Sequence, residues 1–180
     1  MTRAVCMVAH PDDCVIFGYS FIAAWPQLSW TVCYLTYTEQ DPRGQEFEQF
    51  WRGRGVETVF LGFVDDYRDI AAGRVSFNEA AARQAIANTI GAYDLVLTHD
   101  AQGDYGHIHH RLVYSACEHH PAVVTFAPPG QGLLRYCLDP DSWSGQELPL
   151  HHEIIQSFHP KQHVNDYRAT PAAITILETL

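Results

Sequence analysis

The sequence predicts a three-layer α/β/α protein of the Rossmann-like type, built on a mostly parallel sheet. Segments typical of strands and helices alternate through the first 127 residues, which is the pattern of a parallel sheet covered by helices. A length of 180 residues suits one domain, so residues 1–180 are expected to form a single domain with its own core. Hydrophobic residues make up 47% of the chain and charged residues 18%, which excludes an intrinsically disordered protein.

Five short apolar runs are expected to form the parallel strands, in the spatial order 3-2-1-4-5 that is common in such sheets. The runs span residues 4–9, 31–37, 56–63, 95–98 and 122–127. Helices are expected between them. The predicted helices are residues 14–25, ended by Pro26; residues 45–52, with Phe47, Phe50 and Trp51 at helical spacing; a helix opened by a capping box at Ser76–Glu79 and ended by Gly91; and a helix that begins near His110.

The C-terminal part of the sequence predicts a small antiparallel addition to the sheet. Residues 128–150 are rich in Pro, Gly, Asp and Ser, which indicates a loop around a short strand at residues 133–138. Residues 153–158 are expected to pair with that strand. Thr170-Pro171 has the pattern of a capped start for a last helix.

Composition narrows the classes of partner. The net charge is −10 and Lys161 is the only lysine, so the surface disfavours nucleic acids and anionic membranes. No apolar run approaches the roughly 18 residues that span a bilayer, and no export signal is visible, so we expect a cytoplasmic protein. Five scattered cysteines without a C-x-x-C pair suit core positions in a reducing compartment better than a disulfide framework.

Polar residues gather directly after the first predicted strand. Open α/β sheets bind ligands beyond the carboxyl ends of their strands, at the point where the strand order reverses, here after the first and fourth strands. His10-Pro11-Asp12-Asp13 follows the first strand. The two aspartates have an ordinary structural explanation as helix N-caps. We favour a metal held by His10 and Asp13 with Asp12 beside it, because capping leaves His10 and one carboxylate without a role.

A second polar cluster follows the fourth predicted strand. It contains His99, Tyr105, His107, His109 and His110. His107 and His110 are three residues apart at a helix start, so they share one side and suit one site. A solvated, histidine-rich loop is the alternative, and four histidines at a second strand end make it the weaker explanation. Two imidazoles and one carboxylate suit a catalytic zinc with an open fourth position, and iron suits the same ligands.

Together these two motifs resemble those of the PIG-L/LmbE-like de-N-acetylase superfamily. The motifs are Ala-His-Pro-Asp-Asp at residues 9–13 and Gly-Asp-Tyr-Gly-His-x-x-His at residues 103–110, each after an apolar strand. The resemblance covers residues 4–127. It implies a Rossmann-like fold and a zinc-dependent amidase that removes acetyl groups from N-acetylglucosamine units of larger conjugates.

The resemblance also implies roles for individual residues. It places zinc on His10, Asp13 and His110. It makes Asp12 the general base, while Tyr105 and His107 act on the oxyanion and the leaving group. It places near the substrate Arg43, Asp65 or Asp66, and Lys161. His109 departs from the family, which has Asp or Gln at this position, and we expect its side chain to point away from the metal. The chain is also short for the family, so we expect trimmed substrate-covering loops.

The leading hypothesis is a cytoplasmic, zinc-dependent hydrolase. It would remove the N-acetyl or another N-acyl group from an N-acetylglucosamine-type amino sugar or its conjugate through a metal-activated water. Two alternatives stay open: an amidase that acts on a thiol-sugar or another small amide conjugate, and a non-catalytic metal-binding relative. The expected partner is a small amino-sugar substrate, and the sequence is compatible with a homo-oligomer.

Overall fold

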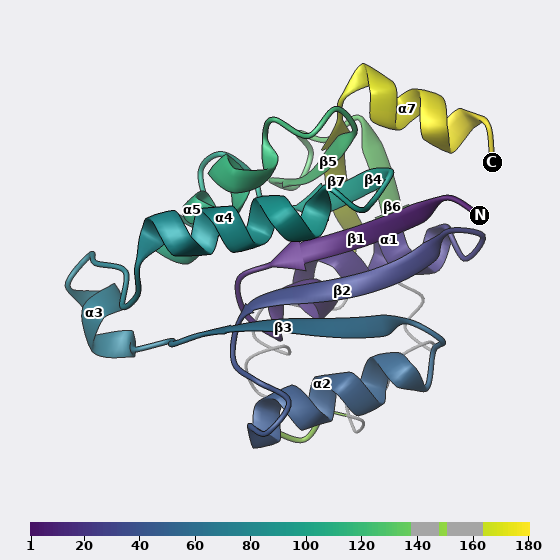
Figure 1. Ribbon diagram of the computed structural model, residues 1–180. Coiled ribbons are helices and arrows are strands. Elements are labelled where there is room, and N and C mark those ends of the chain that lie inside the picture. Colours follow the sequence, from purple (N-terminus) through teal and green to yellow (C-terminus); the bar gives the residue numbers. More distant parts are fainter. Residues whose placement is uncertain (138–147, 151–163) are drawn as a thin grey trace.

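A seven-stranded sheet in the order β3-β2-β1-β4-β5-β7-β6 forms the middle layer of the protein (Figure 1). The computed structural model describes residues 1–137, 148–150 and 164–180. The strands are β1 (Arg3–Val8), β2 (Ser29–Thr36), β3 (Glu57–Phe63), β4 (Leu95–Thr98), β5 (Val123–Ala127), β6 (Leu134–Cys137) and β7 (Val164–Ala169). β1 to β5 run parallel to one another, which confirms the predicted parallel sheet and its 3-2-1-4-5 order.

The antiparallel addition at the C-terminal end of the sheet is also confirmed, and it contains β7, a strand that was not predicted. β6 is the strand predicted at residues 133–138. Its partner is β7, which lies between β5 and β6 and runs antiparallel to both. Residues 153–158, which we expected to pair with β6, lie outside the described residues.

Helices lie where the sequence predicts them, with shifted starts for α2 and α4 and one unexpected short helix. They are η1 (Cys14–Gly18), a π-helical stretch that continues into α1 (Tyr19–Ala24), then α2 (Pro42–Arg52), α3 (Tyr67–Ala71), α4 (Glu79–Ile90), α5 (Ile108–Cys117) and α7 (Pro171–Glu178). α3 was not predicted. Asn78 caps α4, since its side chain accepts a hydrogen bond from the backbone of Ala81 (3.0 Å). Ser76, the expected cap, contacts the backbone of Asp66 instead.

The helices cover both faces of the sheet. Successive side chains of a strand point to opposite faces. Cys6 and Val8 of β1 pack with residues of η1, α1, α2 and α7, whereas Val5 and Met7 pack with residues of α4 and α5. The predicted core role of four cysteines is confirmed, because all are buried as free thiols. They are Cys6, Cys14, Cys33 and Cys117.

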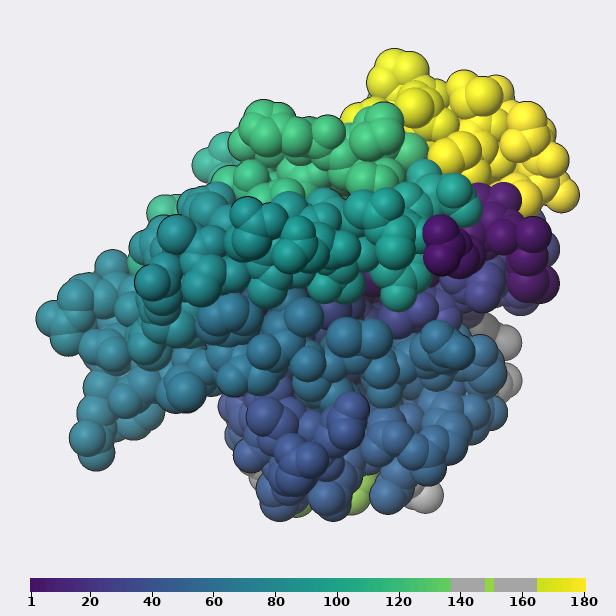
Figure 2. Space-filling model, in the orientation of Figure 1, coloured from purple at the N-terminus to yellow at the C-terminus, as the bar shows by residue number. Residues whose placement is uncertain are grey.

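The sheet brings the two polar loops of the sequence to one edge. β1 pairs with β4 from Ala4 opposite Leu95 to Met7 opposite Thr98, so the loops that follow the two strands start side by side. α5 begins at this edge. Figure 2 shows the segment around α3 projecting from the body of the molecule, and Tyr67 on this segment is 75% exposed. Among the described residues, no helix combines the length and apolar character that a membrane span requires.

Candidate active site

The loop after β1 places His10 and Asp13 by means of a tight turn. The carbonyl of Ala9 accepts hydrogen bonds from the backbone N–H and the hydroxyl of Thr36 (3.1 and 2.8 Å), which fixes the end of β1 against β2. Asp13 Oδ2 accepts a hydrogen bond from the backbone N–H of His10 (2.8 Å). The Asp13 side chain makes no capping hydrogen bond to η1. The buried Asp13 carboxylate therefore turns back toward His10, and capping does not explain it.

The loop after β4 depends on an unusual backbone conformation. Asp100 Oδ1 accepts a hydrogen bond from the backbone N–H of Asp104 (2.9 Å). Gly103 has φ +73° and Asp104 has φ +59°. A Cβ on Gly103 would lie 2.6 Å from the carbonyl oxygen of His107, so the turn requires glycine here. The imidazole of His107 then caps α5, because its Nδ1 accepts a hydrogen bond from the backbone N–H of His109 (3.2 Å).

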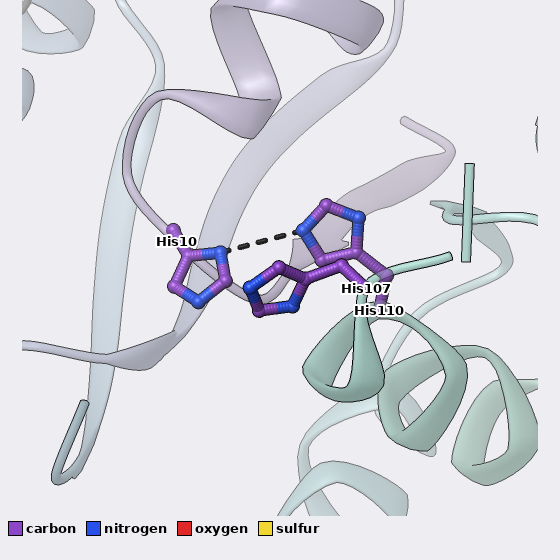
Figure 3. A group of neighbouring side chains, drawn as sticks. All are labelled: His10, His107 and His110. Atoms are coloured by element: carbon purple, nitrogen blue, oxygen red, sulfur yellow. Dashed lines mark hydrogen bonds between the residues drawn. The ribbon is translucent and has the colours of Figure 1, made fainter. Parts of the chain in front are cut away.

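These two loops bring His10, Asp13 and His110 together. Figure 3 shows His10, from the loop after β1, facing His107 and His110 at the start of α5. Asp13 Oδ2 lies 3.2 Å from both His10 Nδ1 and His110 Nε2, and these two nitrogens are 3.4 Å apart. Bonds of about 2.0–2.2 Å to a tetrahedral zinc separate its ligands by about 3.3–3.6 Å. The three atoms are therefore spaced nearly as one such ion requires.

Asp104 holds two histidines behind this group. Its Oδ2 accepts hydrogen bonds from Nδ1 of His110 (2.8 Å) and Nδ1 of His99. His99 Nε2 accepts a hydrogen bond from the backbone N–H of Ala9 (3.0 Å), so both ring nitrogens of His99 are used. His110 consequently faces Asp13 through Nε2, the arrangement by which carboxylates orient metal-binding histidines. We did not predict these roles of Asp104 and His99. The Gly103-Asp104 pair in the turn was the available signal.

The Asp13 carboxylate and the His110 imidazole each stabilise the charged form of the other. Burial by itself would raise the pKa of Asp13, but attraction to His110 and hydrogen bonds from His10 and His110 hold it well below its usual range. Burial opposes the charge on His110 as well, yet Asp13 and Asp104 raise its pKa to about 9. In the metal-free protein a proton on His110 therefore lies between two carboxylates. A cation bound at this place would replace that proton.

The three predicted catalytic residues border the same group. Asp12 is half-buried and directly precedes Asp13. The centroid of the His107 ring lies 4.7 Å from that of His10 and 4.6 Å from that of His110. The Tyr105 ring is 5.2 Å from the His110 ring, and Tyr105 is 56% exposed. Burial and the nearby charges of Asp13 and Asp12 raise the pKa of Tyr105, which keeps its hydroxyl protonated.

Two of the residues predicted near the substrate are linked through a tyrosine. Arg43 Nη1 donates a hydrogen bond to the hydroxyl of Tyr37 (3.1 Å), which in turn donates to Asp65 Oδ2 (3.2 Å). Tyr37 has φ +66°, a conformation that is costly for a tyrosine and is typical of functional sites. Asp65 Oδ1 lies 3.9 Å from His10 Nε2. The side chains from Arg43 to His10 thus form a continuous chain of contacts, in which Tyr37 was not predicted.

The other two predicted substrate residues are not brought to the site by the described structure. The Asp66 side chain caps α3 by accepting a hydrogen bond from the backbone of Arg68 (2.9 Å). Of the two alternatives at this position, the structure therefore places Asp65 near the histidines and uses Asp66 elsewhere. Lys161 lies outside the described residues.

His109 packs against His10 at the ring nitrogen that faces away from Asp13. Its side chain is fully buried, and its Nδ1 lies 3.1 Å from His10 Nε2. This contact is with the ring nitrogen of His10 that faces away from Asp13 and His110, so the expectation that His109 points away from a metal held by these residues stays a prediction. His109 follows the capping residue His107 by two positions in the first turn of α5. This turn directs its side chain toward Nε2 of His10, whereas Asp13 contacts Nδ1 of the same ring.

The fold and this group define a Rossmann-like α/β protein with a candidate metal centre at the carboxyl edge of its sheet. Residues 5–120 match the family model of PIG-L, the GlcNAc-PI de-N-acetylases. The chain therefore belongs to the PIG-L family, as its motifs indicated. No curated protein sequence matches the chain significantly.

Solved structures share the fold at low sequence identity. An N,N′-diacetylchitobiose deacetylase from Pyrococcus horikoshii is 14% identical with a TM-score of 0.61, covering 97% of this chain and 85% of its own. A 4-carboxy-2-hydroxymuconate hydratase from Pseudomonas putida is 15% identical with a TM-score of 0.59, covering 94% and 96%. A deacetylase of teicoplanin biosynthesis is 15% identical with a TM-score of 0.56, covering 87% and 84%. Deacetylases and a hydratase share this fold, so the reaction must be argued from the site.

Proposed function

We propose that this protein is a metal-dependent de-N-acetylase that hydrolyses the N-acyl group of an N-acetylglucosamine-type amino sugar or its conjugate. The observation that carries the proposal is the spacing of His10 Nδ1, Asp13 Oδ2 and His110 Nε2, with separations of 3.2, 3.2 and 3.4 Å. Membership of the PIG-L family supports the reaction type. The net charge of −10 supports a soluble substrate in the cytoplasm over an anionic membrane surface.

The residues of the site fit a zinc ion. Two imidazole nitrogens and one carboxylate oxygen are a ligand set that zinc takes in hydrolases, and iron suits the same set. Asp104 supplies the carboxylate behind His110 that such sites use to fix the ligand. When bound, the metal would supply Lewis-acid activation of the attacking water and of the amide carbonyl.

Asp12 is the residue that we assign to proton transfer. It directly precedes Asp13 and is half-buried beside it. As general base it accepts a proton from the attacking water, and it then delivers that proton to the amide nitrogen as the C–N bond breaks. The other proton of the water leaves with the new carboxyl group and passes to the amine, so the products are a carboxylate and an ammonium ion and no second acid is needed.

His107 and Tyr105 are assigned to the carbonyl oxygen. The Nδ1 of His107 accepts a backbone hydrogen bond, so a neutral His107 carries its proton on Nε2 and donates through it. Burial and the neighbouring histidines His10 and His110 lower the pKa of His107 to about 3, which makes this ring a neutral hydrogen-bond donor near pH 7. Tyr105 contributes a second donor through its protonated hydroxyl. Donors aimed at a developing oxyanion lower the barrier to attack.

Arg43 and Asp65 are assigned to the sugar. Arg43 is exposed and Asp65 is half-buried, and the hydroxyl of Tyr37 joins them. A guanidinium and a carboxylate held apart in this way offer a donor and an acceptor to neighbouring sugar hydroxyls. Lys161 remains assigned to substrate binding from the family resemblance alone.

Acetate release tests the proposed function and the role of Asp12 together. The metal-loaded protein is incubated with N-acetylglucosamine, N,N′-diacetylchitobiose, an N-acetylglucosaminyl inositol and an amide of a thiol sugar. We expect acetate from at least one amino sugar, and loss of this activity when a chelator removes the metal. Asp12→Asn should lower kcat by about 10²–10⁴-fold while the bound metal stays.

Asp69→Asn is the matched control, since this carboxylate of α3 pairs with Arg74 away from the histidines. It should leave acetate release unchanged. Full turnover by Asp12→Asn would contradict the assignment of the base. A metal-loaded protein that releases no acyl group from any compound of the panel would instead favour a non-catalytic relative.

A further inference from the structure

Asp65 and His109 form a second group, around the ring nitrogen of His10 that faces away from Asp13. His10 contacts Asp13 and His110 through Nδ1. Its Nε2 lies 3.1 Å from His109 Nδ1 and 3.9 Å from Asp65 Oδ1. His109 Nδ1 is also 3.9 Å from Asp65 Oδ1. Two imidazole nitrogens and one carboxylate oxygen are therefore arranged around one point.

Two polar atoms of this group are buried without a hydrogen-bond partner among the residues that the structure describes. They are Asp65 Oδ1 and His109 Nε2. Asp65 Oδ2, by contrast, accepts a hydrogen bond from Tyr37. A separation of 3.9 Å from Asp65 Oδ1 to each imidazole is too long for a hydrogen bond. Since buried carboxylate oxygens normally have a donor or a cation, Asp65 Oδ1 indicates that a bound group that donates a hydrogen bond or carries a positive charge belongs here.

We propose that His10 Nε2, His109 Nδ1 and Asp65 Oδ1 form a second site for a divalent transition metal, beside the site of His10, Asp13 and His110. The nearest point equidistant from the three atoms lies in their plane, about 2.1 Å from each, which is the length of zinc–nitrogen and zinc–oxygen bonds. Magnesium and calcium prefer all-oxygen ligands, whereas two imidazoles with one carboxylate suit zinc and its neighbours. The site is therefore assigned to zinc or a metal of similar preference.

The two sites share the imidazole of His10, and this sets their relative affinity. A metal ion on each ring nitrogen makes His10 a bridging ligand, so the second ion displaces the proton that Nε2 would otherwise carry. It also lies close to a first ion of the same charge, which repels it. We therefore expect the second ion to bind at least tenfold more weakly than the first.

Metal counting on the full chain tests this second site. The protein is stripped with a chelator and titrated with Zn²⁺ by calorimetry, and elemental analysis after gel filtration counts the bound metal. We expect two equivalents in the unaltered chain, the second with a dissociation constant at least tenfold larger. Asp65→Asn and His109→Gln should each remove the second equivalent and keep the first. Asp69→Asn, the matched carboxylate control, should keep both.

A single equivalent in the unaltered chain, or two equivalents in Asp65→Asn, would overturn the proposal. Asn has the size of Asp, and Asp65 is half-buried in a loop, so this variant decides the question even where the buried His109→Gln change prevents folding. Circular dichroism melting curves identify such a failure. The proposed function is judged separately, by the first equivalent and by acetate release.

Discussion

Asp104 determines which ring nitrogen of His110 faces the candidate metal centre. Its carboxylate accepts hydrogen bonds from both His110 and His99, and these two contacts, against the cost of burial, lower the pKa of Asp104 to about 2. It reaches this position because the turn puts its backbone at φ +59°. Asp104 therefore fixes the orientation of His110 and, together with Asp13, stabilises its positive charge.

Asp104→Asn should raise the dissociation constant for Zn²⁺ by about 10–100-fold, because a neutral amide orients and polarises His110 less than a carboxylate does. Asn tolerates positive φ well, so the turn should be preserved. Competition with a zinc-binding chromophore measures the constant. Asp69→Asn is the control, and an unchanged dissociation constant in Asp104→Asn would show that Asp104 does not support the metal site.

Tyr105 offers the cleanest test of the oxyanion assignment, since more than half of its surface is exposed and its loss should not unfold the protein. Tyr105→Phe removes only the hydroxyl. We expect kcat for acetate release to fall by about 10²–10³-fold with little change in KM or bound zinc. Tyr67→Phe removes a hydroxyl from another exposed tyrosine and should have no effect. Equal activity of the two variants would rule out Tyr105 as a donor to the oxyanion.

Sequence patterns indicated those candidate site residues that stand in local motifs. His10, Asp13 and His110 follow apolar strands whose order the alternation of strands and helices indicates, so their convergence could be expected. Tyr37 and His109 could not be placed in this way. The role of Tyr37 depends on a positive φ, and that of His109 depends on a contact with a residue 99 positions away.

At the scale of elements, the strands with continuous apolar sequence were predicted and the polar one was not. β7 contains Asn165, Asp166 and Arg168, which hide the pattern of a strand. In the folded protein Asp166 is buried and paired with Arg135 of β6 (2.7 Å), while Tyr167 is buried on the opposite face. An ion pair between neighbouring strands, with Asp166 buried and Arg135 exposed, therefore stands in place of the apolar contact that a sequence pattern detects.

The turn between β4 and α5 requires glycine at position 103 for two reasons. Its φ is positive, and neighbouring atoms leave no room for a Cβ. Gly103 and Gly55 both have positive φ, but a Cβ on Gly55 meets no atom within 4 Å, whereas one on Gly103 meets His107 at 2.6 Å. Gly55→Ala should therefore cost about 1–2 kcal/mol of unfolding free energy from backbone strain alone. Gly103→Ala should cost about 1–3 kcal/mol more, because of the added contact.

Urea unfolding of the two glycine variants measures this difference in stability. Gly103→Ala should also weaken zinc binding, because the turn positions His107 and His110 at the start of α5. Equal unfolding free energies for the two variants would mean that the turn moves to accept the methyl group. In that case the geometry of the histidines would not depend on a glycine at position 103.

At the scale of the whole molecule, the sheet is what assembles the site. His10 and His110 are 100 positions apart, and they meet because β1 and β4 are neighbours in the parallel sheet. The same assembly concentrates ionisable side chains in the interior. Their charges make the stability of the entire fold depend on pH and on metal.

The buried His99 and His109 and the half-buried His107 determine how stability changes as the pH falls. Burial is the main factor that lowers the pKa of His99, of His107 to about 3 and of His109 to about 4. These side chains stay neutral in the folded protein, whereas the unfolded chain takes up protons below about pH 6.5. Their contribution to stability is therefore present above about pH 6.5 and is lost as the pH falls toward 4.

His110 determines how stability changes as the pH rises, and its effect is opposite to that of the other histidines. Its pKa is raised to about 9 by Asp13 and Asp104 against the effect of burial, so its contribution is complete below about pH 6.5 and is lost as the pH rises through 9. The melting temperature of the chelator-treated protein should therefore be highest near pH 6.5. Zinc takes the place of the proton on His110, so the increase in melting temperature on adding zinc should grow between about pH 6.5 and 9. Thermal melts across this range, with chelator and with Zn²⁺, measure both effects. A metal-free protein whose melting temperature rises steadily from pH 6.5 to 9 would contradict the charged pairing of His110 with the two carboxylates.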